Sequence, residues 1–203
     1  MKRFKKKRVS IIGLGFVGLS IAVTNSKKGF PTIGVDIDEG KIQNLRKGIT
    51  DFYEPDLKGF LDECLHVKST EFTTNLKNSI LNTDISFLCV GTPSAKNGAI
   101  NLSFVKSALK NIYKVLKLKK QYHLLVIKST VIPQTTRKDI LPIFEDLINK
   151  GKLDVVSNPE FLREGYAIKD VLYPHLIVIG ENNKRGEIFL RSTIKNFMTS
   201  YLK

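Results

Sequence analysis

One short stretch near the N-terminus restricts the fold of this chain more than any other. A run rich in β-branched residues, Val9–Ile12, leads directly into the pattern Gly-x-Gly-x-x-Gly over Gly13–Gly18. An apolar helix start, Leu19–Thr24, follows at once. A strand, a tight glycine turn and a helix N-terminus in this order are typical of sites that bind dinucleotides. The stretch therefore predicts a nucleotide site.

Each glycine has its own purpose in such a turn. Gly13 lets the chain turn off the strand, Gly15 lets the backbone approach a pyrophosphate, and Gly18 lets the helix pack closely on the sheet. The N–H groups and the positive dipole end of the helix then face the phosphates. A second strand, Thr32–Val35, ends in Asp36, about 20 residues further on, where an acid is expected to hold the ribose hydroxyls.

The composition is that of an ordinary globular chain. Its 203 residues suit one domain with a substantial core, and 42% of them are hydrophobic. No apolar run approaches the roughly 20 residues of a membrane span, so no membrane partner is expected. The two cysteines, Cys64 and Cys89, give no disulfide framework, which favours a reducing cytoplasm.

A basic arm over residues 1–8 precedes the first strand and lacks the apolar core of a signal peptide. The net charge of +14 comes from lysines and arginines that are spread along most of the chain, without an aromatic-rich recognition motif. We therefore expect no specific nucleic-acid partner. Residues 9–203 are expected to form the domain itself.

Helical and strand patterns alternate along the chain. The further strands expected are Phe72–Thr74, Ile85–Val90, His123–Ile127, Asp154–Ser157 and Leu176–Gly180. The further helices expected are Asp38–Lys47, Leu57–Leu65, Leu76–Leu81, Leu102–Leu116, Thr135–Ile148 and Lys184–Leu202. This alternation predicts an α/β fold, a Rossmann-type doubly wound, mainly parallel sheet with helices on both faces.

In such sheets the ligand lies outside the carboxyl ends of the strands. Two further segments, Val90–Pro93 and Lys128–Val131, follow apolar strands and carry small or hydroxyl-bearing residues, so they are expected to join the glycine turn and Asp36 there. Both segments are also compatible with ordinary strand-to-helix turns in which Ser and Thr cap the helix. The sequence predicts no metal site.

The block Asn158–Gly165 again follows a strand directly. Its two acids, Glu160 and Glu164, stand where a helix is expected to begin, with Arg163 beside one of them. Acids favour a helix N-terminus because of its dipole. A catalytic carboxylate at the mouth of the cleft has the same pattern, and the residues alone leave both interpretations open.

Taken together, these pieces resemble the N-terminal domain of the UDP-glucose/GDP-mannose 6-dehydrogenase family. The likeness runs from about Val9 to Gly180, and the Asn158–Glu164 block is its most specific element. The other matching pieces are the glycine turn, Val35–Asp36, Tyr53–Pro55, Val90–Pro93, Lys128–Val131 and Ala167–Asp170.

The resemblance implies an NAD-dependent enzyme that oxidises the C6 alcohol of a nucleotide sugar, GDP-mannose or UDP-glucose, to a carboxylate. The family reaction consists of hydride transfer, capture of the aldehyde by a cysteine, a second hydride transfer and thioester hydrolysis. Asp36 favours NAD over NADP, because its charge would repel a 2′-phosphate.

The resemblance also implies roles for single residues. Those expected at the adenosine and pyrophosphate half of NAD are Gly13, Gly15, Phe16, Val17, Gly18, Asp36 and Lys41. Those expected toward the nicotinamide are Thr92, Ser129, Thr130 and Glu164, with Val90, Gly91 and Pro93 completing the cofactor contacts. Glu160, which would work with water in the hydrolytic step, and Thr130 are the catalytic candidates. The residues expected to border the sugar nucleotide are Glu160, Phe161, Leu162 and Arg163.

Two stretches favour the GDP-mannose branch of the family. These are Cys89–Gly98 with Leu102, and Tyr173–Gly180, where UDP-glucose members usually carry an arginine in place of Leu176.

The chain also departs from the family. Family members are longer, and their nucleophile is a cysteine in a Gly-Phe-Gly-Gly-x-Cys motif that has no match here. Gln134 and Asp56 stand where the family usually has glycine, which affects the local geometry of two turns.

We therefore interpret the chain as the NAD-binding part of a nucleotide-sugar 6-dehydrogenase, truncated and inactive alone, with a C-terminal half as its partner. A non-catalytic NAD-binding module or half of a split enzyme is the alternative. A β-hydroxyacid dehydrogenase would share the glycine turn but not the Asn158–Glu164 block.

Overall fold

The computed structural model describes residues 7–94, 98, 100–132 and 134–199. Its centre is one sheet with the strand order β3-β2-β1-β4-β5-β6-β7. The strands are β1 Val9–Ile12, β2 Thr32–Val35, β3 Thr70–Thr73, β4 Ile85–Leu88, β5 His123–Ile127, β6 Leu153–Ser157 and β7 Gly180–Glu181. All neighbours pair parallel except β6 and β7. The predicted doubly wound α/β fold is confirmed.

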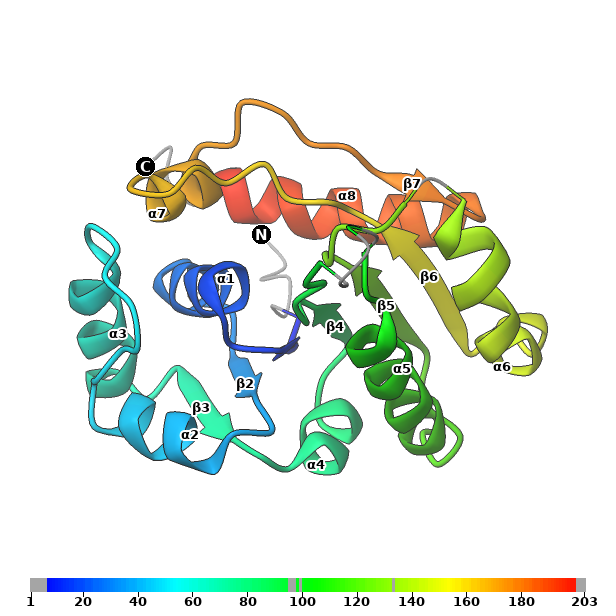
Figure 1. The fold of residues 1–203 in the computed structure, drawn as a ribbon. Coiled ribbons are helices and arrows are strands. Elements are labelled where there is room, and N and C mark those ends of the chain that lie inside the picture. The colour runs from blue at the N-terminus through cyan, green and yellow to red at the C-terminus, as the bar shows by residue number, and fades with distance from the viewer. Residues whose placement is uncertain (1–6, 95–97, 99, 133, 200–203) are drawn as a thin grey trace, which may run out of the picture.

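Helices cover both faces of the sheet (Figure 1). They are α1 Phe16–Lys27, α2 Glu39–Arg46, α3 Leu57–His66, α4 Leu76–Leu81, α5 Ser103–Leu116, α6 Glu145–Asn149, α7 Ala167–Leu172 and α8 Lys184–Thr199, with a π-helix Thr136–Ile140 and a 3₁₀-helix Leu141–Phe144. Figure 1 shows α1 and α8 on one side of the sheet and α4, α5 and α6 on the other. No helix in the described ranges is long and apolar enough to cross a membrane.

The hydrophobic core follows the alternation of side chains along the strands. Ile11 of β1 packs with α1 and α3 on one face, through Leu19 and Leu61. Leu125 of β5 packs on the other face, in a cluster that includes Leu109 of α5. The central strands are buried on both faces, as expected for a parallel sheet covered by helices.

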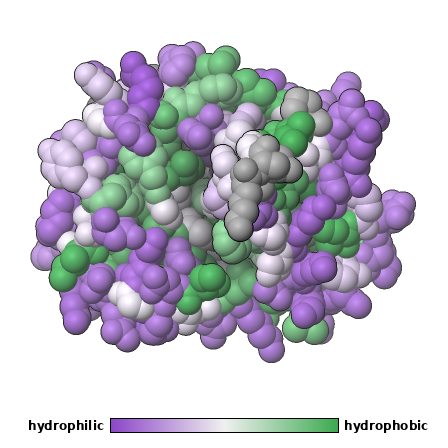
Figure 2. Space-filling model, viewed as in Figure 1, coloured by the Kyte–Doolittle hydropathy of each residue, from purple (hydrophilic) through white to green (hydrophobic). Residues whose placement is uncertain are grey.

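The strand expected over Leu176–Gly180 is wrong except at its last residue, because β7 consists of Gly180 and Glu181 alone. Leu176 and Val178 are instead 48% and 40% exposed. The carbonyl oxygen of Val178 accepts a hydrogen bond of 2.7 Å from Nδ2 of Asn158, a side chain and not a strand backbone. Figure 2 shows apolar side chains gathered at the top of this face, over the segment that leads to β7.

The single helix expected over Thr135–Ile148 is also wrong, because three short helices of different pitch take its place. Pro142 lies at the start of the 3₁₀ turn. Proline has no N–H for an α-helical hydrogen bond, and its ring clashes with the preceding turn, so the helix changes pitch there.

No helix begins within Asn158–Gly165, which was expected to contain a helix start. The next helix, α7, begins only at Ala167. Further along, α8 ends at Thr199, and residues 200–202 of the expected helix Lys184–Leu202 lie outside the described residues. Most of the basic arm lies outside them as well. Its last residue, Arg8, donates from its backbone nitrogen to Oδ2 of Asp84 over 2.9 Å.

The two turns that lack the usual glycine keep a glycine-like backbone. Asp56 has φ = 65° and Gln134 has φ = 74°, both in the left-handed region. A side chain in this region costs about 1 kcal/mol or more relative to glycine. Asp56 and Gln134 therefore keep the conformation of the two turns, but we expect each of them to lower the stability of the fold.

Candidate functional site

The glycine turn joins β1 to α1, and its three glycines differ in what surrounds them. A Cβ atom on Gly18 would lie 1.8 Å from the carbonyl oxygen of Gly13, and one on Gly13 would lie 2.9 Å from the carbonyl oxygen of Cys89. Gly13 also has φ = 92°. A Cβ atom on Gly15 would meet nothing within 4 Å. Gly13 and Gly18 thus allow the turn to close, whereas Gly15 leaves its outer side open to a ligand.

The helix start beyond this turn is suited to an anion. Gly15 occupies the N-cap of α1, and no side chain caps the helix. The first N–H groups of a helix have no partner within it, so they are left to water or to a ligand with negative charge. Phe16 and Val17, both half-buried, form the first turn, and the Phe16 ring packs against that of Phe52 at 5.6 Å between centroids.

Asp36 lies at the carboxyl end of β2 and braces the glycine turn. Its Oδ2 atom accepts a 2.8 Å hydrogen bond from the backbone nitrogen of Leu14, and its Oδ1 atom accepts one of 3.1 Å from that of Asp38. The carboxylate is half-buried and lies beside the turn. Sequence and structure thus place the acid and the glycines at neighbouring strand ends.

Lys41, in the first part of α2, forms an ion pair of 3.0 Å between its Nζ atom and Oδ2 of Asp51. Burial works to lower the pKa of Lys41, but the hydrogen bond and charge of Asp51, with the charges of Asp36 and Asp38, outweigh it and raise the pKa. Lys41 is therefore a fixed positive charge close to Asp36, the residue that follows β2.

The ends of β4 and β5 are tied together by a hydroxyl group. Oγ of Ser129 donates to the carbonyl oxygen of Val90 over 2.6 Å. Thr92 is half-buried, and Gly91, Pro93 and Thr130 are exposed. Capping was the other interpretation of these segments, and it is wrong, since α5 begins only at Ser103 and the π-helix at Thr136.

Lys128 connects the end of β5 to the block after β6. Its Nζ atom donates to Oδ1 of Asn158 at 3.3 Å and to the carbonyl oxygen of Pro159 at 3.4 Å. Burial lowers the pKa of Lys128, and the nearby Cys89 and Glu160 work in the opposite direction. The strand ends from β2 to β6 therefore form one continuous edge, as expected.

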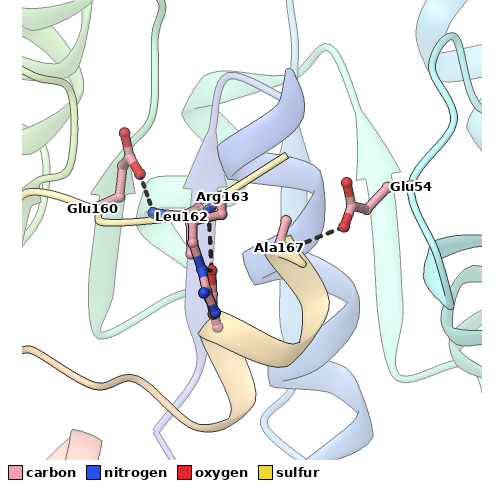
Figure 3. Close-up of polar contacts among 6 residues, drawn as sticks. Glu54, Glu160, Leu162, Arg163 and Ala167 are labelled. Atoms are coloured by element: carbon pink, nitrogen blue, oxygen red, sulfur yellow. Dashed lines mark hydrogen bonds and ion pairs between the residues drawn. The ribbon is translucent and has the colours of Figure 1, made fainter. Parts of the chain in front are cut away.

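The block after β6 is held by carboxylates (Figure 3). Oε2 of Glu160 accepts a 2.7 Å hydrogen bond from the backbone nitrogen of Leu162. The guanidinium of Arg163 is bidentate to Asp170, with Nη2 2.7 Å from Oδ1 and Nε 3.0 Å from Oδ2. The hydrogen bond from Arg163 holds the pKa of Asp170 below its usual value. The charge of Arg163 is thus matched inside the chain, while Glu164 is exposed.

Three of the predicted substrate residues, Glu160, Phe161 and Leu162, line a mainly apolar cavity of about 120 Å³. Its other walls include Phe87 of β4 and Ile194 of α8. Arg163 and the glycine turn are not among the described residues that line this cavity.

Neither cysteine is placed as a nucleophile. Cys64 and Cys89 are both free and buried. Burial raises the pKa of the Cys64 thiol, and it raises that of Cys89 to about 12. A reactive cysteine needs an exposed thiolate of low pKa, so both are core residues.

Two residues with a part in this site were given no role from the sequence. Asp170 is the partner of Arg163, and Glu54 binds the backbone of Gly165 and Ala167. The Tyr53–Pro55 motif marked Glu54, but no local pattern reports a contact between residues 111 positions apart.

Comparison with known proteins decides the family. The model of the UDP-glucose/GDP-mannose dehydrogenase family, NAD binding domain, matches residues 7–198. The chain belongs to this family. The match is to the NAD-binding domain, so the predicted cofactor NAD is confirmed.

The chain is 39% identical over 181 residues to the GDP-mannose 6-dehydrogenase of Pseudomonas aeruginosa, covering 88% of this chain and 42% of that protein. It is 41% identical over 184 residues to the UDP-glucose 6-dehydrogenase of Rickettsia bellii, covering 90% of this chain and 41% of that protein. A ternary complex of the Pseudomonas aeruginosa GDP-mannose dehydrogenase superposes with a TM-score of 0.88 at 34% identity, covering 96% of this chain and 48% of that chain.

GDP-mannose 6-dehydrogenases thus stand among the matching relatives, as the sequence preference for that branch predicts. The chain spans less than half the length of the relatives it matches.

Proposed function

We propose that the chain binds NAD with the pyrophosphate at Gly13–Gly18 and serves as the cofactor half of a nucleotide-sugar 6-dehydrogenase. The open side of Gly15 carries this proposal, because a Cβ atom placed there would meet nothing within 4 Å, which leaves room for a pyrophosphate to approach the turn. The uncapped start of α1, with Phe16 and Val17, supplies N–H groups for the phosphates.

In this arrangement Asp36 accepts hydrogen bonds from the adenosine ribose hydroxyls, while Lys41 supplies positive charge beside it. Asp36 disfavours NADP, because a 2′-phosphate would stand against its carboxylate. NAD, when bound, supplies the hydride acceptor. The residues proposed around its nicotinamide half are Val90, Gly91, Thr92, Pro93, Ser129, Thr130 and Glu164.

The block after β6 borders the sugar nucleotide, for which we propose GDP-mannose. Phe161, Leu162 and Arg163 position the sugar, while Glu160 orients and deprotonates the water that ends the reaction. Thr130 is the second catalytic residue that we propose. Both cysteines are free, which agrees with a reducing cytoplasm as the proposed location. Because both are also buried, the covalent step requires a cysteine from outside these 203 residues.

The 203-residue chain alone is expected to produce no NADH from GDP-mannose or UDP-glucose, because it offers no accessible thiolate and an incomplete substrate site. Fused to the C-terminal part of the Pseudomonas aeruginosa relative, it is expected to produce NADH from GDP-mannose. In the fusion, Glu160→Gln is expected to slow thioester hydrolysis more than hydride transfer. Absorbance of NADH at steady state and in the first turnover separates these steps.

Glu145→Gln, an exposed change on α6, is the matched control and should leave both steps unchanged. Turnover of either sugar nucleotide by the isolated chain would contradict the proposal, since it requires a nucleophile that the chain does not present. A folded fusion that binds NAD but oxidises neither sugar nucleotide would favour the non-catalytic module.

A further inference from the structure

Glu54 is a buried carboxylate whose hydrogen bonds go to a distant part of the chain. Its side chain is in the loop before α3, and the residue is 4% exposed. Oε1 accepts a 2.7 Å hydrogen bond from the backbone nitrogen of Ala167, and Oε2 accepts one of 2.9 Å from that of Gly165. Figure 3 shows Glu54 reaching from its loop to the start of α7.

The neighbours of Glu54 in the same loop contact the proposed cofactor residues. Asp51 forms the 3.0 Å ion pair with Lys41, and the ring of Phe52 packs 5.6 Å from that of Phe16. One short loop thus contacts α2 and the start of α1 through two side chains, and the block after β6 through a third.

The block after β6 has little regular structure of its own, so its shape depends on these contacts. Residues 158–163 form neither helix nor strand. Three carboxylates bind its backbone nitrogens: Glu160 that of Leu162, Asp170 that of Arg163, and Glu54 those of Gly165 and Ala167. Glu54 is the only one of the three that comes from outside the block and α7.

We propose that Glu54 is a positioning residue, which fixes the block Glu160–Gly165 relative to the cofactor half of the domain. Each hydrogen bond from a backbone N–H to a carboxylate is stronger than a neutral one, and two of them define both the distance and the direction of the α7 start. Glu160, Phe161 and Leu162 precede this anchor on a short backbone path. A misplacement of about 1 Å at such groups costs on the order of 100-fold in rate.

The consequence for substrate binding rests on the proposed function, whereas the anchoring of the block does not. Amide hydrogen exchange, followed residue by residue by NMR in the whole 203-residue chain, tests the anchoring. In Glu54→Ala we expect exchange to be about tenfold faster at Gly165 and Ala167, and also at Leu162 and Arg163. Glu54→Gln keeps one acceptor oxygen and should give a smaller acceleration.

Ligand titrations of the same variants test the consequence. With Glu54→Ala we expect about tenfold weaker binding of GDP-mannose, measured by NMR shifts, and NAD affinity within about twofold of the wild type. Glu63→Ala is the matched control and should change neither affinity. It removes an exposed carboxylate of α3 that pairs with Lys27 of α1.

Acceleration confined to Gly165 and Ala167 would show that Glu54 only caps α7, and would overturn the proposal. Equal losses of NAD and GDP-mannose affinity, with general acceleration of exchange, would overturn it as well, because they indicate loss of fold. If neither the wild-type chain nor its fusion to the C-terminal part of the Pseudomonas aeruginosa relative gives shifts with GDP-mannose, the proposed substrate is wrong, while exchange at Leu162 and Arg163 still decides the role of Glu54.

Discussion

Replacing Gly15 with valine is expected to remove NAD binding and to leave the fold intact. Gly15 has φ = −75°, which valine adopts without strain, and its Cβ would meet no atom within 4 Å. The valine methyl groups would then fill the space that the pyrophosphate needs. We expect a loss of affinity of at least about 100-fold by calorimetry, with the free energy of unfolding within about 0.5 kcal/mol of the wild type.

Gly18→Ala is the matched comparison, because it changes a glycine of the same turn for a different reason. The added Cβ would stand 1.8 Å from the carbonyl oxygen of Gly13, so the backbone must move. This variant should lose about 3 kcal/mol of stability. Normal NAD binding by a folded Gly15→Val variant would show that the cofactor lies elsewhere.

Asp154→Ala is expected to cause the largest loss of stability among the single changes considered. Asp154 is 1% exposed and accepts hydrogen bonds from Nε of Arg185 at 2.6 Å, from Nδ2 of Asn183 at 2.6 Å and from the hydroxyl of Tyr122 at 2.8 Å. These contacts tie the start of α8 to β6. Only the carboxylate of this ion pair is buried, since the Arg185 side chain is 51% exposed. Removing a buried carboxylate that accepts hydrogen bonds from three side chains costs about 3 kcal/mol, which lowers the Tm by roughly 10 °C at this chain length.

The pH dependence of this loss follows from the pKa of Asp154. Burial works to raise this pKa, but the hydrogen bonds from Arg185, Asn183 and Tyr122 outweigh burial and lower it. The contribution of Asp154 is therefore fully present above the ordinary pKa of 3.8 and is lost as the pH falls through the lowered value. Urea unfolding at several pH values measures it.

The control is Asp139→Ala, because Asp139 forms a 3.3 Å ion pair with Lys106 in which both side chains are about half exposed. Such pairs contribute roughly 0–1 kcal/mol. Equal losses of stability in the two variants would show that the contacts of Asp154 with the start of α8 contribute no more than an exposed ion pair.

The sequence predicted the sheet well because each central strand is an apolar run that the covering helices bury on both faces. It misplaced Leu176–Ile179, because an apolar run becomes a strand only where a neighbouring strand offers free backbone groups. It missed the three-part helix after Thr135, although Pro142 was a signal for the break.

Some residues of the candidate site were likewise predictable from the sequence, and others were not. Gly13–Gly18 and Asp36 were predictable, because the glycine spacing and the acid after the second strand are local patterns with a known geometry. The partner of Arg163 and the role of Glu54 were not, because both depend on how separate segments meet after folding.

The most direct test of the central proposal is a calorimetric titration of the wild-type chain with NAD and with NADP. Asp36 follows β2 beside the glycine turn and accepts a hydrogen bond from the nitrogen of Leu14, so its charge is fixed next to the turn at which we propose the cofactor to bind. In that arrangement the carboxylate would repel a 2′-phosphate. The account predicts NAD binding at least about tenfold tighter than NADP binding, a difference of about 1.4 kcal/mol. Equal or tighter binding of NADP, or no binding of NAD at millimolar concentration, would contradict it.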